Sequence, residues 1–223
     1  MIGFYNYTVY LTYLSIISGT LGIVISLSGR GHPFIGAFFL LFSGLCDAFD
    51  GKVARTKSDR TDGEMKYGIQ IDSLSDLVAF GVLPACMGVA MFRLLSVRRS
   101  TVNRSYSILI FAVAVVYVLA AMIRLAYYNV TEEERQQTET GTRKKYTGLP
   151  VTSAALIFPA VLLIGYLCPI DITPVYFAVM LFTAFAFLSK IEITKPGLRG
   201  ILIMVGIGIV EFVLIVLLRA FSR

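Results

Sequence analysis

Two pairs of aspartates are the residues of this sequence whose type and spacing best suit chemistry. Asp47 and Asp50 are three positions apart, and Asp72 and Asp76 are four positions apart. In a helix, residues at these spacings project from the same face. If the two helices are neighbours, four carboxylates converge, and ligand sets made only of oxygen suit a hard divalent cation such as Mg²⁺ or Mn²⁺. The sequence therefore predicts a metal site built from these acids.

The segments that carry the acids must lie in a membrane. The apolar run 35–46 has only twelve residues, whereas a helix needs about 20 to cross the hydrocarbon core. Its helix must therefore continue through Asp47 and Asp50, and the apolar stretch 77–92 likewise begins directly after Asp76. Each ionised acid at membrane depth costs about 2.5–3.5 kcal/mol, so such acids normally mark function.

A second interpretation is that the acids cap helix ends and pair at the interface with Lys52, Arg55 and Lys57. It explains single acids at helix ends. It does not explain two pairs that are each matched to one helical face.

Composition extends the membrane assignment to the whole chain. Of 223 residues, 57% are hydrophobic and 15% are charged, and the mean hydropathy is +0.77, which argues against a soluble globular domain. We predict an all-α fold, a polytopic membrane helix bundle of six to eight transmembrane helices that forms one integral membrane domain, 1–223. Pro84, in mid-span, is expected to kink its helix. The seven predicted spans, five clear and two shorter, are 8–28, 34–55, 69–94, 105–129, 149–168, 172–189 and 200–219.

The net charge of +6 points to membrane and substrate partners and away from nucleic acid. The basic residues lie at span ends and in short loops instead of forming a soluble basic face. Placing the connection between the second and third spans in the cytoplasm gives that side 13 Lys and Arg against 7. The arginines in 93–104 act against this orientation. We expect a multi-pass protein of the cell membrane with its acids on the cytoplasmic side.

Small residues and an arginine accompany the first acid pair. Gly51 follows Asp50, and Ala54 and Arg55 come one turn later. Glycine lets a substrate approach the backbone closely, and the planar fork of Arg55 suits phosphate oxygens. Small residues in membrane helices also serve as helix-packing positions. Beside the acids, we favour a nucleotide diphosphate site.

The complete string resembles the CDP-alcohol phosphotransferase family. The pattern of that family is Asp, two residues, Asp-Gly, two residues, Ala-Arg, usually eight residues, Gly, three residues, Asp, three residues, Asp. In one place the sequence departs from it, because twelve residues, 56–67, separate Arg55 from Gly68. The acids of this polar stretch, Asp59, Asp62 and Glu64, are expected to be solvated. The matching positions are Asp47, Asp50, Gly51, Ala54, Arg55, Gly68, Asp72 and Asp76.

The resemblance implies roles for these residues. The four acids would hold a two-metal site of Mg²⁺ or Mn²⁺, and Asp76 would also accept the proton of the acceptor hydroxyl. Thr12 of the first span would lie near the nucleotide, although Val9 stands where the family often has an asparagine. A homodimer is also suggested. The residues that would line the CDP pocket are Gly51, Ala54, Arg55 and Gly68.

Three further stretches, 72–85, 124–129 and 148–150, look like the phosphatidylserine synthase branch of this family. With the motif, the similarity covers 9–195, and the helix 200–219 lies beyond it. This likeness implies transfer of the phosphatidyl group from CDP-diacylglycerol to L-serine, with release of CMP.

Two residues of the fourth span would bind the serine in that reaction, Arg124 through the carboxylate and Asn129 beside it. In an equally acceptable interpretation, Arg124 snorkels to lipid headgroups or pairs with a catalytic acid.

Other functions remain open at this point. The acceptor can instead be glycerol 3-phosphate or inositol, and the lipid can be an archaeal ether lipid. A cation transporter also uses intramembrane carboxylates, but it would not need Gly51, Ala54 and Gly68 at fixed distances. A purely structural membrane protein leaves the buried acids unexplained.

Overall fold

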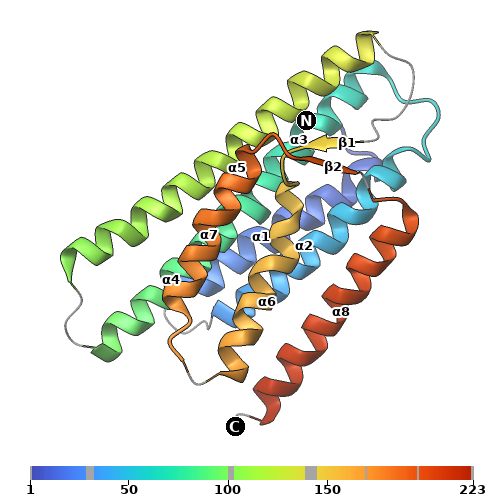
Figure 1. Cartoon of the computed structure of the whole chain (residues 1–223). Helices are drawn as coiled ribbons and strands as arrows, with labels where there is room; N and C mark the ends of the chain where they lie inside the picture. Colours follow the sequence, from blue (N-terminus) through green and yellow to red (C-terminus); the bar gives the residue numbers. More distant parts are fainter. Residues whose placement is uncertain are drawn as a thin grey trace.

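The computed structural model of the chain describes residues 2–28, 33–99, 103–138, 145–168, 170–194 and 196–221. Almost all of the apolar segments in these ranges are helical. The helices lie side by side along one common direction (Figure 1). They are α1 (Tyr10–Leu27), α2 (Pro33–Ala54), α3 (Asp62–Asp76), α4 (Leu83–Arg99), α5 (Arg104–Thr138), α6 (Ala154–Leu167), α7 (Thr173–Leu188) and α8 (Leu198–Phe221). Short 3₁₀ turns, Tyr7–Val9 and Val151–Ser153, precede α1 and α6.

The predicted all-α membrane bundle is confirmed. Among the described residues, five helical stretches are long and apolar enough to cross a membrane: Tyr7–Leu27, Pro33–Ala54, Asp62–Ser96, Arg104–Arg135 and Leu198–Leu218. Two shorter apolar helices, Val151–Leu167 and Thr173–Leu188, complete the set of seven. These five long and two shorter helices correspond to the five clear and two shorter spans predicted from the sequence.

Helix α5 extends beyond the fourth predicted span, 105–129. Helix α5 continues past residue 129 to Thr138, through the acids at 132–134. Arg135 donates from Nη2 to Glu132 Oε1 at 2.6 Å, one turn away on the same face. Pairs at this spacing stabilise helices in water, so α5 extends beyond its apolar part.

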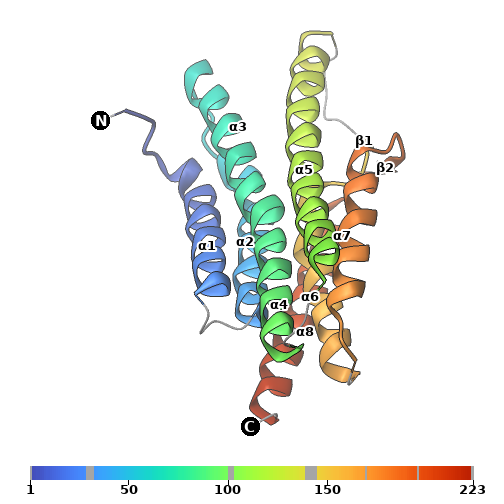
Figure 2. The same cartoon turned by 90° about the vertical axis from the view of Figure 1, so that its left-hand side faces the viewer.

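Close packing of small residues joins α1 to its neighbours. A side chain on Gly19 would meet Ala79, and one on Gly22 would meet Leu83. Hydroxyls bind across the α1 and α2 interface, where Ser18 Oγ donates to the Phe39 carbonyl at 2.8 Å. Membrane helices approach closely where small residues and hydroxyls face each other, so α1 lies flush against α2 and against the column of α3 and α4 (Figure 2).

The distortion expected at Pro84 takes the form of a π-helical turn, Leu77–Val82, between α3 and α4. Pro84 has no N–H to donate to the preceding turn. The hydroxyl of Tyr117 on α5 donates to the Phe80 carbonyl at 2.7 Å and supplies a donor there. The acid-bearing helix therefore changes its winding directly after Asp76, and α5 holds the distortion in place.

Two short strands, which the sequence does not predict, lie at the same end of the bundle as the start of α3 (Figure 1). Strand β1 (Lys145–Thr147) pairs antiparallel with β2 (Glu192–Thr194). Gly148 follows β1 with φ +77°, and its N–H donates to the Ile191 carbonyl at 2.8 Å. This pairing fixes the start of α6 against the end of α7.

We expect Gly148→Ala to destabilise the fold. A Cβ at residue 148 would lie 2.5 Å from the Phe187 carbonyl oxygen, and the positive φ adds strain. The expected loss is about 1–3 kcal/mol, measured as a lower thermal unfolding temperature in detergent. Gly197→Ala is the matched control, since nothing lies within 4 Å of its added Cβ. Equal unfolding temperatures for the two variants would contradict the prediction.

Candidate active site

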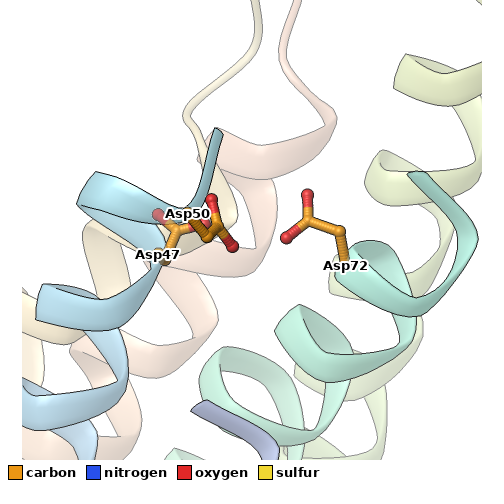
Figure 3. Close-up of side chains that lie close together, drawn as sticks. All are labelled: Asp47, Asp50 and Asp72. Carbon is orange, nitrogen blue, oxygen red and sulfur yellow. The ribbon is translucent and has the colours of Figure 1, made fainter. Parts of the chain in front are cut away.

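Three carboxylates from two helices meet near one end of the bundle. Asp47 and Asp50 come from the last turns of α2, and Asp72 faces them from α3 (Figure 3). One oxygen from each residue lies within 4.8 Å of the others. Such a set of hard oxygen ligands fits a divalent cation. The two helical pairs predicted from sequence thus come from adjacent helices.

Asp76 lies one turn further along α3 and is buried, with 8% of its surface exposed against 9% for Asp50. It is not part of the group of three that meets within 4.8 Å. It still lies close enough to Asp47, Asp50 and Asp72 for their charges to interact. The structure therefore separates the fourth acid from the cluster while keeping it beside the other three.

Helix α1 forms hydrogen bonds with both of the helices that carry the acids. Thr12 is buried, and its hydroxyl donates to Asp50 Oδ2 at 3.5 Å. Ser75, between the two acids of α3, donates from Oγ to the Thr12 carbonyl at 3.3 Å. One residue of α1 thus contacts both acid-bearing helices. This places Thr12 beside the carboxylates.

The small residues of the motif lie at the outer edge of the cluster. The guanidinium of Arg55, an exposed residue, lies over Gly51, with Nη1 3.4 Å from the position of an added Cβ. Ala54 and Gly68 flank a different arginine, Arg60. Its Nη1 donates to the Ala54 carbonyl at 3.5 Å, and its Nη2 lies 2.8 Å from the position of a Cβ on Gly68.

The prediction that Glu64 is solvated is wrong. Only 12% of its side chain is exposed. Its Oε1 accepts from Asn6 Nδ2 and from Lys57 Nζ, each at 2.7 Å, and it forms a capping box with Thr61 at the start of α3. Hydrogen bonding to Glu64 raises the pKa of the Lys57 ammonium. Lys57 and Thr61 are near Glu64 in the sequence, whereas Asn6 is 58 residues away and only the fold brings it to this carboxylate.

Asp59 and Asp62, the other acids of this segment, are exposed as predicted.

The two residues predicted to bind serine lie on the face of α5 toward the acids. Arg124 is buried, with 8% exposed, and its guanidinium lies 5.1 Å from the ring centre of Tyr128. Its charge acts on Asp47 and on Asp76. Because it is buried, Arg124 does not snorkel to headgroups.

Asn129, one turn and a half further along α5, has a partner on α3. Its Nδ2 donates to Ser73 Oγ at 2.8 Å. Ser73 follows Asp72 directly, so this hydrogen bond joins α5 to the acid-bearing helix beside the carboxylate cluster.

Tyr146, which no pattern in the sequence marks, is brought to this group by β1. Its ring centre lies 5.7 Å from that of Tyr128. Burial raises the pKa of its phenol, whereas the nearby charge of Arg124 acts in the opposite direction. The sequence carries little signal for this placement, because a three-residue strand in a polar connection has no periodicity to detect.

The fold and the carboxylate cluster define a polytopic membrane protein with an acidic site between two of its candidate membrane-spanning helices. The chain matches the CDP-alcohol phosphatidyltransferase family over residues 5–210, and it belongs to that family. The resemblance given by the motif is thus confirmed. No solved structure matches the chain.

Curated relatives point to one branch of the family. The chain is 33% identical over 155 residues to the CDP-diacylglycerol-serine O-phosphatidyltransferase of Saccharomyces cerevisiae, covering 66% of this chain and 50% of the relative. It is 30% identical over 138 residues to the protein of the same name from Helicobacter pylori, covering 61% and 50%. It is also 32% identical over 156 residues to the archaetidylserine synthase of Methanothermobacter thermautotrophicus, covering 70% and 57%. The chain spans about half the length of these relatives.

We expect each of Asp47→Asn, Asp50→Asn and Asp72→Asn to weaken Mn²⁺ binding. Each substitution replaces one charged oxygen ligand of the cluster. Loss of a group that only orients a metal ligand already lowers metal affinity about 10- to 100-fold, so the loss of a ligand itself should lower the Mn²⁺ affinity at least about tenfold. Isothermal titration of the purified protein with Mn²⁺ measures the change. The control is Asp59→Asn, an exposed acid outside the cluster. Unchanged affinity in all three variants would remove the metal assignment.

Proposed function

We propose that the chain transfers the phosphatidyl group of CDP-diacylglycerol to L-serine and releases CMP. The observation that carries the proposal is the meeting of Asp47, Asp50 and Asp72 on adjacent helices in a member of the CDP-alcohol phosphatidyltransferase family. The names of the relatives support serine as the acceptor. The intramembrane position of the acids suits a substrate whose reactive phosphate is attached to lipid tails.

Asp47, Asp50, Asp72 and Asp76 hold two Mg²⁺ or Mn²⁺ ions in this proposal. The donor set fits, because all the ligands are carboxylate oxygens and hard cations prefer them. When bound, the metal neutralises the charge that develops on the diphosphate as CMP departs. Without that counter-charge the converging acids would repel one another.

The acceptor loses its proton to Asp76. The serine hydroxyl oxygen attacks the phosphorus that carries the diacylglycerol, and the bond from that phosphorus to the CMP oxygen breaks. A carboxylate base is useful because the hydroxyl proton becomes acidic only in the transition state. Asp76 lies beside the other three acids but outside their closest contact, which leaves it suited to accept that proton.

The nucleotide lies at the outer edge of the cluster. Gly51, Ala54 and Gly68 keep the backbone accessible there, and the exposed guanidinium of Arg55 binds phosphate oxygens. Thr12 contacts the nucleotide from α1, next to Asp50.

Serine binds on the α5 side. Arg124 receives its carboxylate, held in a buried position over Tyr128. Asn129, further along the same helix, also binds the serine, and its hydrogen bond to Ser73 orients its side chain.

In this proposal the enzyme lies in the cell membrane with its site on the cytoplasmic side. The larger number of Lys and Arg on that side, 13 against 7, supports this orientation. A homodimer is proposed from the family resemblance.

The test is CMP release from CDP-diacylglycerol by the purified chain with Mn²⁺ or Mg²⁺. L-serine, glycerol 3-phosphate and inositol are compared as acceptors. We expect release with serine, and Asp76→Asn should lower kcat about a hundredfold or more because the proton acceptor is lost. Release with a different acceptor would move the specificity and keep the chemistry. No release with any acceptor would reopen cation transport.

The archaetidylserine synthase relative favours a second candidate donor, a CDP-activated ether lipid. The same assay with CDP-archaeol in place of CDP-diacylglycerol distinguishes the two donors by their KM values.

Arg124→Lys should raise the KM for serine about tenfold, because an ammonium cannot bind a carboxylate in the bidentate way of a guanidinium. The KM for CDP-diacylglycerol should stay within a factor of about two if Arg124 contacts only the acceptor. Arg135→Lys, on the same helix but paired with Glu132, is the matched control. Equal changes in both KM values would show that Arg124 supports the acids instead of the serine.

A further inference from the structure

Arg60 occupies a position that the motif does not predict. It lies in the polar stretch 56–67, which is four residues longer than the usual family spacing of eight. Its side chain turns inward, so that Nη1 lies 3.5 Å from the Ala54 carbonyl oxygen and Nη2 lies 3.3 Å from that of Glu64. Nη2 also lies over the bare backbone of Gly68. The guanidinium therefore spans the gap between the end of α2 and the start of α3.

The two helix ends that Arg60 bridges lie close to the acids in each helix. Ala54 comes four residues after Asp50 in α2, and Gly68 comes four residues before Asp72 in α3. A spacing of four places each small residue one turn from its acid, on the same face. Arg60 is thus one helical turn beyond the acids on both helices at once.

The guanidinium has unused capacity for hydrogen bonding. Its Nε is buried and has no hydrogen-bond partner in the part of the chain that the structure describes. Its two contacts with carbonyl oxygens, at 3.5 and 3.3 Å, are at the long end of the hydrogen-bond range. No described carboxylate lies within the 4.0 Å of an ion pair with it. Arginine offers five donors in a fixed fork, so one further N–H on each of Nη1 and Nη2 is not used by these carbonyl contacts.

The segment that carries Arg60 is firmly held. Glu64 accepts hydrogen bonds from Lys57 on one side of Arg60 and from the backbone N–H of Thr61 on the other. Asn6 ties the same carboxylate to the N-terminal segment. The Tyr7 hydroxyl lies 3.2 Å from Thr56 Oγ1 and adds a second link. Because both sides of the loop are fixed, Arg60 is positioned before any ligand arrives.

We propose that Arg60 is a further phosphate-binding residue, which contacts the diphosphate of a nucleotide-activated lipid at the outer edge of the carboxylate cluster. The inference rests on the proposed function. The guanidinium of Arg60 lies one turn from the acids that hold the metal in the proposed function. It is therefore placed to bind the two phosphates of such a substrate. It acts beside Arg55, which lies over Gly51 on the α2 side.

The test compares Arg60→Ala, Arg60→Gln and the matched control Lys66→Ala. Lys66 forms an exposed pair with Asp62 in the first turns of α3, so its removal takes away one positive charge nearby without touching the gap. Isothermal titration of the full chain with CDP, with and without Mn²⁺, gives the affinity for the nucleotide. Competition by cytidine, which has no phosphate, isolates the part due to the base.

We expect both Arg60 variants to bind CDP about tenfold or more weakly, as the loss of a charge-assisted hydrogen bond implies. Their affinity for cytidine should be unchanged, and the KM for CDP-diacylglycerol should rise while the KM for serine does not. Lys66→Ala should resemble the wild type. Thermal unfolding temperatures equal to that of the wild type show that the variants fold. Arg60→Gln keeps an uncharged polar side chain at this position if Arg60→Ala does not fold.

Three outcomes would overturn the inference: CDP binding equal to that of the wild type in the Arg60 variants, an equal loss in Lys66→Ala, or an equal loss for cytidine. Each would leave the proposed function intact as long as the wild type releases CMP. If the wild type binds no CDP at all, the proposed function fails first, and the role of Arg60 fails with it.

Discussion

Carboxylates held close together in a low-dielectric environment are the constraint on which the rest of this structure depends. Their charges repel one another, and each loses hydration on leaving water. A divalent cation resolves both problems, and the three carboxylates offer the oxygen ligands that such an ion takes. The acids also need fixed positions. They therefore come from helices, α2 and α3, whose neighbours prevent rotation, and not from loops.

The surrounding helices supply that rigidity with ordinary membrane chemistry. Helix α1 approaches through Gly19 and Gly22 and binds the acid-bearing helices through short hydroxyl side chains. Helix α5 contributes Tyr117 at the π-helical turn and the buried cation Arg124. A single positive charge opposite several acids reduces their repulsion without satisfying all of them. The protein thus keeps a partly compensated site, which suits a binding partner that is itself charged.

Polar segments lie at the same end of the bundle as the start of α3 and are ordered by contacts with one another. Glu64 accepts hydrogen bonds from Asn6, Lys57 and Thr61 and orders the stretch 56–67. The pairing of β1 with β2 brings Tyr146 toward Arg124. The acids and the small residues follow the pattern of the CDP-alcohol phosphatidyltransferase family, to which the chain belongs. The longer segment before Gly68 departs from that pattern. Differences between members are most easily accommodated there, because loops change length without disturbing the helices they join.

The sequence alone determined the features that depend on local periodicity. Apolar runs predicted the seven spans, five clear and two shorter. The spacing of Asp47 with Asp50 and of Asp72 with Asp76 predicted two matched faces, because helix geometry is the same wherever a helix forms. Tertiary structure alone decided which groups meet. It brought three acids within 4.8 Å and kept Asp76 apart, buried Glu64, and turned Arg60 toward Gly68. These contacts join residues from different helices and loops, and their distances depend on how whole elements pack, which no local pattern in the sequence records.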